Sequence, residues 1–281
     1  MTTVSRTTPP ELVTGDGPPP PPHRPWVFIY EYQVLVYRRL WRASISSRLL
    51  MPLFFLLAMG IGLGTLVNKA NGGIQVGDRM VPYLLFVVPA ILAVQSMTTG
   101  MGESSWPVLG AIKFFGGYHA MLATPARVID ILKAHVAYVA TQVAMAAAIF
   151  MVVAGVFGGF PSWSALWCLP VSVLLGVAFT TLVVALTARL EDDGGFNVLF
   201  RLGQTPMMLF SGTFFPISQL PGWMQPLAWF TPLWHGVEAN RALALGTGNL
   251  PGVFGHLAAL VGFAVLGWVL ALRGLQRRLV P

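Results

Sequence analysis

The chain has 281 residues and a mass of 30.4 kDa; 55% of the residues are hydrophobic and only 10% are charged. A soluble domain carries about 25% charged residues, so this composition and the mean hydropathy of +0.70 exclude a single water-soluble globular domain and a disordered protein. Cys168 is the only cysteine, which excludes an intrachain disulfide and a cysteine-rich zinc site. The net charge of +7 accompanies long apolar runs, and it therefore indicates a membrane partner rather than nucleic acid.

The first 25 residues are rich in proline, with five consecutive prolines at Pro18–Pro22, and they lack the apolar stretch of a secretory signal peptide. This composition does not support a packed core, so residues 1–25 are predicted to be a disordered cytoplasmic tail. A tail without a partner and a tail that binds a proline-recognising partner are both compatible with it.

Residues 26–47 have the pattern of an amphipathic helix. Its apolar side chains recur at helical spacing and share one face: Tyr30, Val34, Tyr37 and Trp41. Its cationic side chains are Arg38, Arg39 and Arg42. We expect an interfacial helix along the cytoplasmic leaflet. The alternative is a simple cytoplasmic extension of the first membrane span.

Six stretches have the length and apolar character of a membrane span, which needs about 20 apolar helical residues. They cover residues 48–67, 81–101, 131–156, 166–188, 196–215 and 253–272. The fifth is interrupted by Arg201, Gln204 and Pro206. If both termini are cytoplasmic, only Lys69, Arg79 and Arg241 of the 17 Lys and Arg lie outside. This bias predicts an all-α integral membrane protein with six transmembrane helices and cytoplasmic N- and C-termini.

Residues 215–245 are apolar but cannot form one straight helix, because prolines recur along them at positions 216, 221, 226 and 232. We expect short re-entrant helices between spans five and six, entering the membrane from the outer side. Such helices must be buried against protein, because lipid cannot form hydrogen bonds with the free N–H and C=O groups of their irregular backbone.

No catalytic residues are predicted. The sequence has no G-x-x-x-x-G-K-[ST] phosphate loop, no H-E-x-x-H and no G-x-S-x-G. The five histidines show no metal-ligand spacing, so no metal site is predicted. The acidic run Glu191-Asp192-Asp193 could bind a cation, but it also suits a solvated loop that begins the next helix. Glu238 is the acidic residue closest to a membrane position.

The loop between spans two and three carries a first motif, with Gly117, Tyr118, Ala120, Met121, Leu122, Ala123, Thr124 and Pro125 at its matching positions. It resembles the loop motif G-x-Y-E-A-M-L-A-T-P of ABC-2 type transporter permeases. His119 stands where that family commonly has glutamate. This departure puts any salt bridge made by the glutamate in doubt.

A second motif extends from Ser211 to Leu243 and is similar to the same family, especially to the branch of the nodulation-factor exporter permease NodJ and the daunorubicin-resistance permeases. The matching residues are Phe214-Phe215-Pro216, Leu220-Pro221, Trp229, Thr231-Pro232, His235-Gly236 and Glu238. The resemblance covers the chain from about Tyr30 onwards. It leaves the Pro-rich tail outside.

The resemblance implies a transmembrane domain over residues 48–281 that pairs with a second permease copy or a related permease. It also implies two copies of a separate ABC ATPase subunit, which would hold ATP and Mg, while this chain binds no cofactor. The loop at about 110–127 would be the coupling helix, with contacts from Gly117, Tyr118, His119, Met121, Leu122, Thr124 and Pro125. Tyr118, Met121 and Leu122 are expected to be exposed to a groove of the ATPase. An ordinary connection, or packing beneath the membrane surface, is the alternative.

The second motif would cap the transport pathway as an outer gate, with the residues Phe214, Phe215, Trp229, His235, Glu238 and Arg241. The implied function is export of an amphipathic molecule, such as a lipid, glycolipid, lipo-oligosaccharide or drug-like compound, across a bacterial inner membrane. A polysaccharide-exporting ABC permease, a standalone secondary transporter or channel, and a membrane enzyme acting on lipid are the alternatives. A secondary transporter would need a buried acidic residue within a span.

Overall fold

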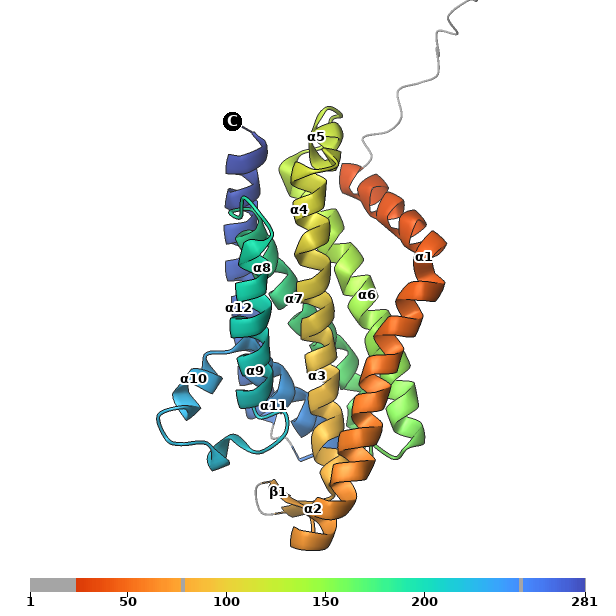
Figure 1. The fold of residues 1–281 in the computed structure, drawn as a ribbon, viewed down its shortest axis with the longest axis vertical. Helices are drawn as coiled ribbons and strands as arrows, with labels where there is room; N and C mark the ends of the chain where they lie inside the picture. Colours follow the sequence, from red (N-terminus) through yellow and green to blue (C-terminus); the bar gives the residue numbers. More distant parts are fainter. Residues whose placement is uncertain (1–23, 77–78, 248–249, 281) are drawn as a thin grey trace, which may run out of the picture.

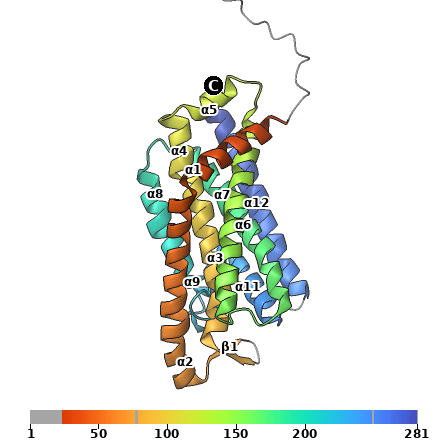
Figure 2. The same ribbon diagram turned by 90° about the vertical axis from the view of Figure 1, so that its right-hand side faces the viewer.

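In the computed structural model, the backbone is described for residues 24–76, 79–247 and 250–280, and the side chains for the same ranges except 40–52 and 61. The predicted tail, residues 1–25, lies almost entirely outside the described residues. The chain forms one elongated bundle of helices whose long members run side by side (Figure 1). The N-terminal end of the first helix and the C-terminus lie at the same end of this bundle (Figure 1, Figure 2).

The first part of the chain is one long bent helix followed by a small hairpin. It is composed of α1 (Pro25–Phe55), a π-helical segment η1 (Leu56–Leu63) and α2 (Gly64–Asn71). The helix ends at Gly72, whose φ of 74° is the left-handed conformation that glycine readily adopts. Strands β1 (Ile74–Val76) and β2 (Arg79–Val81) then pair antiparallel, with Ile74 opposite Val81.

The middle of the chain supplies three long helices and two short ones. They are α3 (Tyr83–Ser104), α4 (Trp106–Lys113), α5 (Gly117–Leu122), α6 (Val128–Val156) and, after the 3-10 turn η2 (Trp163–Trp167), α7 (Cys168–Thr187). Helix α7 lies at the centre, packed against α3, α6 and α12. Small residues allow these close contacts: a Cβ added at Gly100 of α3 would lie 2.5 Å from the carbonyl oxygen of Gly176 in α7.

The last part alternates between short and long helices. They are α8 (Gly194–Val198), the π-helical η3 (Leu199–Gln204), α9 (Thr205–Phe210), the 3-10 turn η4 (Ile217–Gln219), α10 (Gln225–Trp229), α11 (Pro232–Leu245) and α12 (Leu250–Leu279). The division of residues 215–245 into short helices is confirmed, and that these helices are re-entrant stays a prediction. Helix α11 packs against α3, α7 and α12 near the end of the bundle opposite α5.

Within the described ranges, five helical stretches are long and apolar enough to cross a membrane: Leu53–Asn71, Tyr83–Lys113, Val128–Val156, Trp163–Thr187 and Leu250–Leu279. They correspond to the predicted spans one to four and six. The predicted fifth span is a helical run over residues 194–210 that ends before Phe215 and is not among the five. It nevertheless lies alongside the bundle (Figure 1). Trp106 of α4 packs against it, with its ring 5.1 Å from the ring of Phe200 and nearly parallel to it.

The predicted boundary between an interfacial helix (26–47) and a first span beginning at 48 is not a break in the structure, since α1 continues through it. The aromatic face of this helix also has a protein partner. The hydroxyl of Tyr30 lies 3.1 Å from Oγ1 of Thr141, and the hydroxyl of Tyr37 donates to Sδ of Met145 at 3.9 Å. The N-terminal part of α1 therefore packs on α6. The side chains of Trp41 and Arg42 lie outside the described set.

Candidate functional site

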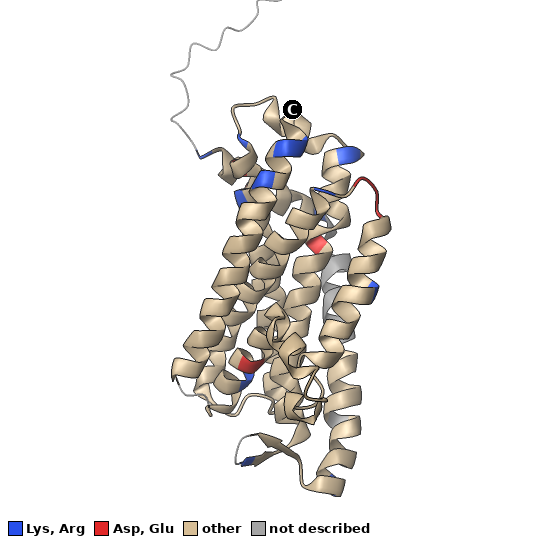
Figure 3. Ribbon diagram, turned by 90° about the vertical axis from the view of Figure 1, so that its left-hand side faces the viewer, with Lys and Arg blue, Asp and Glu red and all other residues tan. Residues whose placement is uncertain are grey.

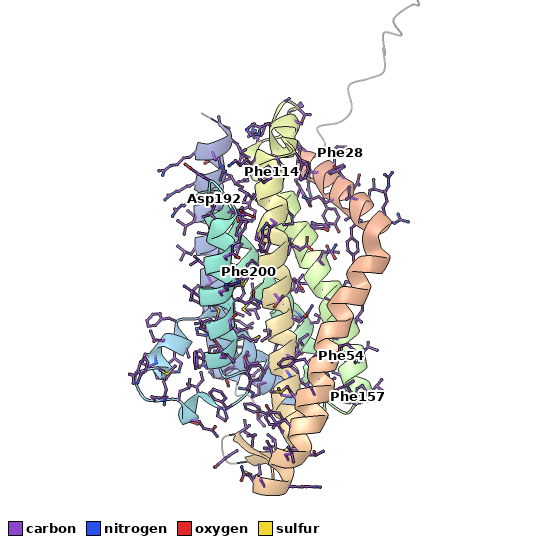
Figure 4. The ribbon with its side chains drawn as sticks, in the orientation of Figure 1. Phe28, Phe54, Phe114, Phe157, Asp192 and Phe200 are labelled. Carbon is purple, nitrogen blue, oxygen red and sulfur yellow. The ribbon has the colours of Figure 1, made fainter. Side chains whose placement is uncertain are left out.

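The segment between α4 and α5 forms one tip of the bundle, beside the C-terminus (Figure 1). Gly116 adopts a φ of 57°, which reverses the chain direction between the two helices. Just before this turn, Phe114 is 69% exposed and Phe115 is 84% exposed. Figure 4 shows Phe114 at this end of the bundle. Two adjacent exposed phenylalanines outside the membrane-spanning stretch are unusual without a partner.

The expected exposure of Tyr118 is wrong. Tyr118 is only 4% exposed and packs in an apolar cluster with residues such as Ile112, Val128 and Ile131. Met121 and Leu122 are half-buried against the same cluster. A six-residue helix has too few backbone hydrogen bonds to be stable alone, so its apolar side anchors it to α6. Burial raises the pKa of the Tyr118 hydroxyl above its usual range.

The outward side of α5 consists of the other residues of the motif. His119, Ala120, Ala123, Thr124 and Pro125 are exposed, and Gly117 is half-buried. The hydroxyl of Thr124 donates to the carbonyl oxygen of Met121 at 2.6 Å, which closes the helix. The backbone N–H of Arg127 donates to Oδ2 of Asp130 at 3.1 Å, which fixes the start of α6. These two hydrogen bonds fix the backbone of the tip, so its outward surface is preformed.

The acidic loop adjoins this tip (Figure 4, labelled Asp192). Lys113 Nζ donates to the carbonyl oxygen of Glu191 at 2.6 Å, and Oδ1 of Asp192 accepts from the N–H of Gly194 at 3.0 Å. This second contact lies at the first residue of α8, as expected for a loop that begins a helix. In the described parts of the chain, no group of three or more potential metal-ligating side chains lies together.

At the opposite half of the bundle, Arg241 is the centre of a buried polar cluster. It is 3% exposed, and its guanidinium lies 3.9 Å from the centroid of the Phe86 ring on α3. Its Nη1 donates to Oε1 of Glu238, and its Nη2 donates to the carbonyl oxygen of Gly212 at 2.7 Å. One side chain therefore joins α11 to α3 and to the segment after α9.

His235, the third polar residue of the predicted gate, lies in a separate cluster. Its Nδ1 is 3.0 Å from Nδ1 of His256 on α12, and Trp234 meets both imidazole rings edge to face. Trp229 lies next to Trp234, with the ring centroids 6.4 Å apart. The structure thus brings Glu238 and Arg241 together, and His235 and Trp229 into one aromatic group.

A cavity of about 290 Å³ lies where the first helix, α3 and the 194–214 segment meet. Its walls are mostly apolar, with one amide and two hydroxyls: Phe55, Ile91, Val94, Gln95, Thr98, Met208, Thr213 and Phe214. Of the predicted pathway residues, only Phe214 lines it. Phe215 is half-buried and lines neither this cavity nor the two polar clusters just described.

Sequence reasoning missed several residues of these sites. Phe114 and Phe115 precede the motif and do not belong to its pattern; two adjacent phenylalanines in a short loop were the available signal. His256 and Phe86 come from distant helices. No local spacing in the sequence could have placed them beside His235 and Arg241.

The fold and its long apolar helices define a multi-pass membrane protein. Residues 29–245 match the ABC-2 type transporter family, and the chain belongs to this family, as the two motifs predicted. It is 32% identical over 257 residues to Nodulation protein J of Rhizobium meliloti (strain 1021), which covers 91% of this chain and 94% of that protein. The E. coli (strain K12) Inner membrane transport permease YadH is 24% identical over 260 residues, 90% of this chain and 97% of that protein. The chain is therefore a transport permease.

Proposed function

We propose that the chain is the membrane subunit of an ATP-driven exporter and that its α4–α5 tip docks on a separate ATPase subunit. The observation that carries this proposal is the pair Phe114 and Phe115, exposed on a tip whose underlying helix is anchored by Tyr118. Because the tip is anchored, a movement of the ATPase can displace α4 and α6, whereas a loose loop would move without displacing them. His119, Thr124 and Pro125 complete the contact.

The charge distribution supports a cytoplasmic position for this tip. Lys and Arg gather at the end of the bundle where the C-terminus lies (Figure 3). Because cytoplasmic segments are enriched in Lys and Arg, this end faces the cytoplasm, where ATP is available. The helical run 194–210 then serves as the fifth of six spans, and α10 and α11 lie toward the outer side as re-entrant elements.

The cavity between the first helix, α3 and the 194–214 segment supports an amphipathic cargo. Its apolar walls suit acyl or aromatic groups, and the polar side chains of Gln95 and Thr98 among them suit a polar part of the cargo. A volume of about 290 Å³ holds only part of a glycolipid or drug-like molecule. A second permease copy facing this side would enlarge the path, and the functional unit is accordingly a permease dimer with two ATPase copies.

The direct test is a pull-down of the tagged chain from gently solubilised native membranes, followed by mass spectrometry of the bound proteins. The proposal predicts a near-stoichiometric partner with a phosphate-binding loop. It also predicts that Phe114→Ser with Phe115→Ser removes this partner, because aromatic residues at the centre of an interface contribute about 2 kcal/mol or more each.

A matched control is Trp163→Ser with Leu166→Ser, which removes two exposed apolar side chains beyond the far end of α6 (90% and 65% exposed). This control should retain the partner. If the wild-type chain is recovered without any ATPase but transports in proteoliposomes, a standalone transporter replaces the proposal.

A further inference from the structure

The last turns of α7 and α12 enclose a basic pocket that the transport proposal leaves unexplained. Its volume is about 340 Å³, and four of the seven residues that line it are arginines: Arg189, Arg273, Arg277 and Arg278. The floor is formed where Gly274 of α12 approaches Ala188 closely; a Cβ added at Gly274 would lie 3.0 Å from the Ala188 Cβ. The pocket lies at the Lys- and Arg-rich end of the bundle (Figure 3).

One of the four arginines has a structural role. Arg278 Nη1 donates to the carbonyl oxygen of Thr187 at 3.0 Å and to that of Leu190, so it caps the end of α7. The other three behave differently. Within the described residues, the side chains of Arg189, Arg273 and Arg277 have no ion pair or hydrogen bond, and all three residues are exposed. The nearby acidic side chains, Glu191 to Asp193, form no salt bridge with them.

Three uncompensated arginines around one pocket repel one another and favour an anionic ligand. A phosphate group fits this set, because guanidinium groups bind its oxygens in a bidentate manner. Phosphate could come from a free anion or from the headgroup of a lipid. The surface that leads to the pocket distinguishes these two sources.

Helix α12 presents an apolar strip that runs directly into the arginines. Leu266, Val269, Arg273 and Arg277 follow at spacings of 3, 4 and 4 and therefore share one helical face. Leu266 is 53% exposed and Val269 is 39% exposed, and Leu270 continues the strip into the pocket wall. The face thus changes from apolar to cationic near the end of the membrane span, as an acyl chain followed by a phosphate would require.

We propose that this pocket binds the headgroup of an anionic phospholipid of the cytoplasmic leaflet, with Arg189, Arg273 and Arg277 around the phosphate and an acyl chain along Leu266 and Val269. The site is distinct from the cavity at Phe55 and Met208 and from the α4–α5 tip. It does not depend on an ATPase partner. Its occupant would fix the end of α12 relative to α7 and relieve the repulsion among the arginines.

The test is native mass spectrometry of the purified full-length chain, titrated with phosphatidylglycerol or with phosphatidylcholine of the same acyl chains. The wild-type chain should bind the anionic lipid preferentially. Each arginine near a charged lipid surface contributes about fivefold in affinity, so Arg273→Gln with Arg277→Gln should reduce the preference by at least about tenfold. Leu266→Ser with Val269→Ser should weaken the binding of both lipids.

The matched control is Lys69→Gln with Arg79→Gln, which removes two exposed cationic side chains from α2 and β2, at the end of the bundle opposite the pocket. It should keep the wild-type preference. The proposal is overturned if the Arg273/Arg277 variant and the Lys69/Arg79 variant lose the preference equally, or if neither loses it. It is also overturned if inorganic phosphate at equal concentration displaces the lipid, which would make the pocket a site for free anions. Unchanged lipid binding together with loss of a co-purified ATPase would reassign the arginines to a protein contact.

Discussion

The guanidinium of Arg241 stacks over the ring of Phe86 at 3.9 Å and joins the short helix α11 to the long helix α3. The same side chain pairs with Glu238 and donates to the carbonyl oxygen of Gly212. It therefore joins α11 and the segment at Gly212, which are 29 residues apart, to α3, which lies more than 100 residues earlier in the sequence. A residue with this many contacts determines how the half of the bundle opposite α5 is assembled.

Arg241→Met should destabilise the purified protein strongly, because it leaves the Glu238 carboxylate and the Gly212 carbonyl without their partner. Loss of one member of a fully buried pair costs about 3–5 kcal/mol. Glu238 keeps about a third of its side chain exposed, so we expect about 2 kcal/mol. Thermal unfolding in detergent measures the change. Arg79→Met, at an exposed position of β2, should have almost no effect; equal losses in both variants would contradict the structural role of Arg241.

Close contact between α12 and α7 requires a glycine at position 267. A Cβ there would lie 2.4 Å from Oγ1 of Thr181 and 2.7 Å from the backbone nitrogen of Leu182. Gly267→Ala should therefore cost about 1–3 kcal/mol, as expected for overpacking. Gly262→Ala on the same helix meets no heavy atom within 4 Å and should be neutral or slightly stabilising. Unfolding curves that rank the two variants in the reverse order would show that the helices do not pack as described.

Tyr118 and His119 are neighbours in the first motif but should respond differently to the same change. Tyr118→Asp places a charge in an apolar cluster and should lower stability by about 3 kcal/mol. His119→Asp changes an exposed residue and should alter stability by less than about 0.5 kcal/mol. Tyr118→Phe should be close to wild type, because it keeps the ring. If Tyr118→Asp leaves the unfolding temperature unchanged, the anchor assigned to this residue is wrong.

The thiol of Cys168 should resist maleimide in the folded protein. Its side chain is fully buried, and Sγ donates to the carbonyl oxygen of Asn240 at 3.4 Å. Labelling should begin only when the protein unfolds, which mass spectrometry during a denaturant titration can follow. Rapid labelling under native conditions would show that α7 and α11 separate readily.

The positions of the long helices were predictable because a helix that crosses the membrane needs an apolar stretch as long as the hydrocarbon core is thick. The run over residues 194–210 was less well predicted, since Arg201 and Pro206 break its apolar pattern. Two α-helical pieces and a π-helical piece between them replace one regular helix. The prolines correctly indicated short helices between Phe215 and Leu245.

The side chains of the candidate sites were predicted less well than the helices. The motif around Tyr118 gave the wrong exposed face, because a six-residue helix has no long periodic pattern that separates its two sides. The partners of Arg241 and His235 depend on tertiary packing of α3 and α12. Only Glu238, three residues before Arg241, could be assigned from helical spacing.

The proposed contact of the α4–α5 tip with an ATPase can be measured directly by crosslinking. Because Cys168 is the only cysteine and is buried, Phe115→Cys supplies a single exposed thiol at the tip, and Trp163→Cys supplies one at the far end of α6. A thiol crosslinker applied to native membranes should join Phe115→Cys, and not Trp163→Cys, to a protein with a phosphate-binding loop. Equal crosslinking of both variants, or no protein product from Phe115→Cys, would contradict the coupling role of this tip.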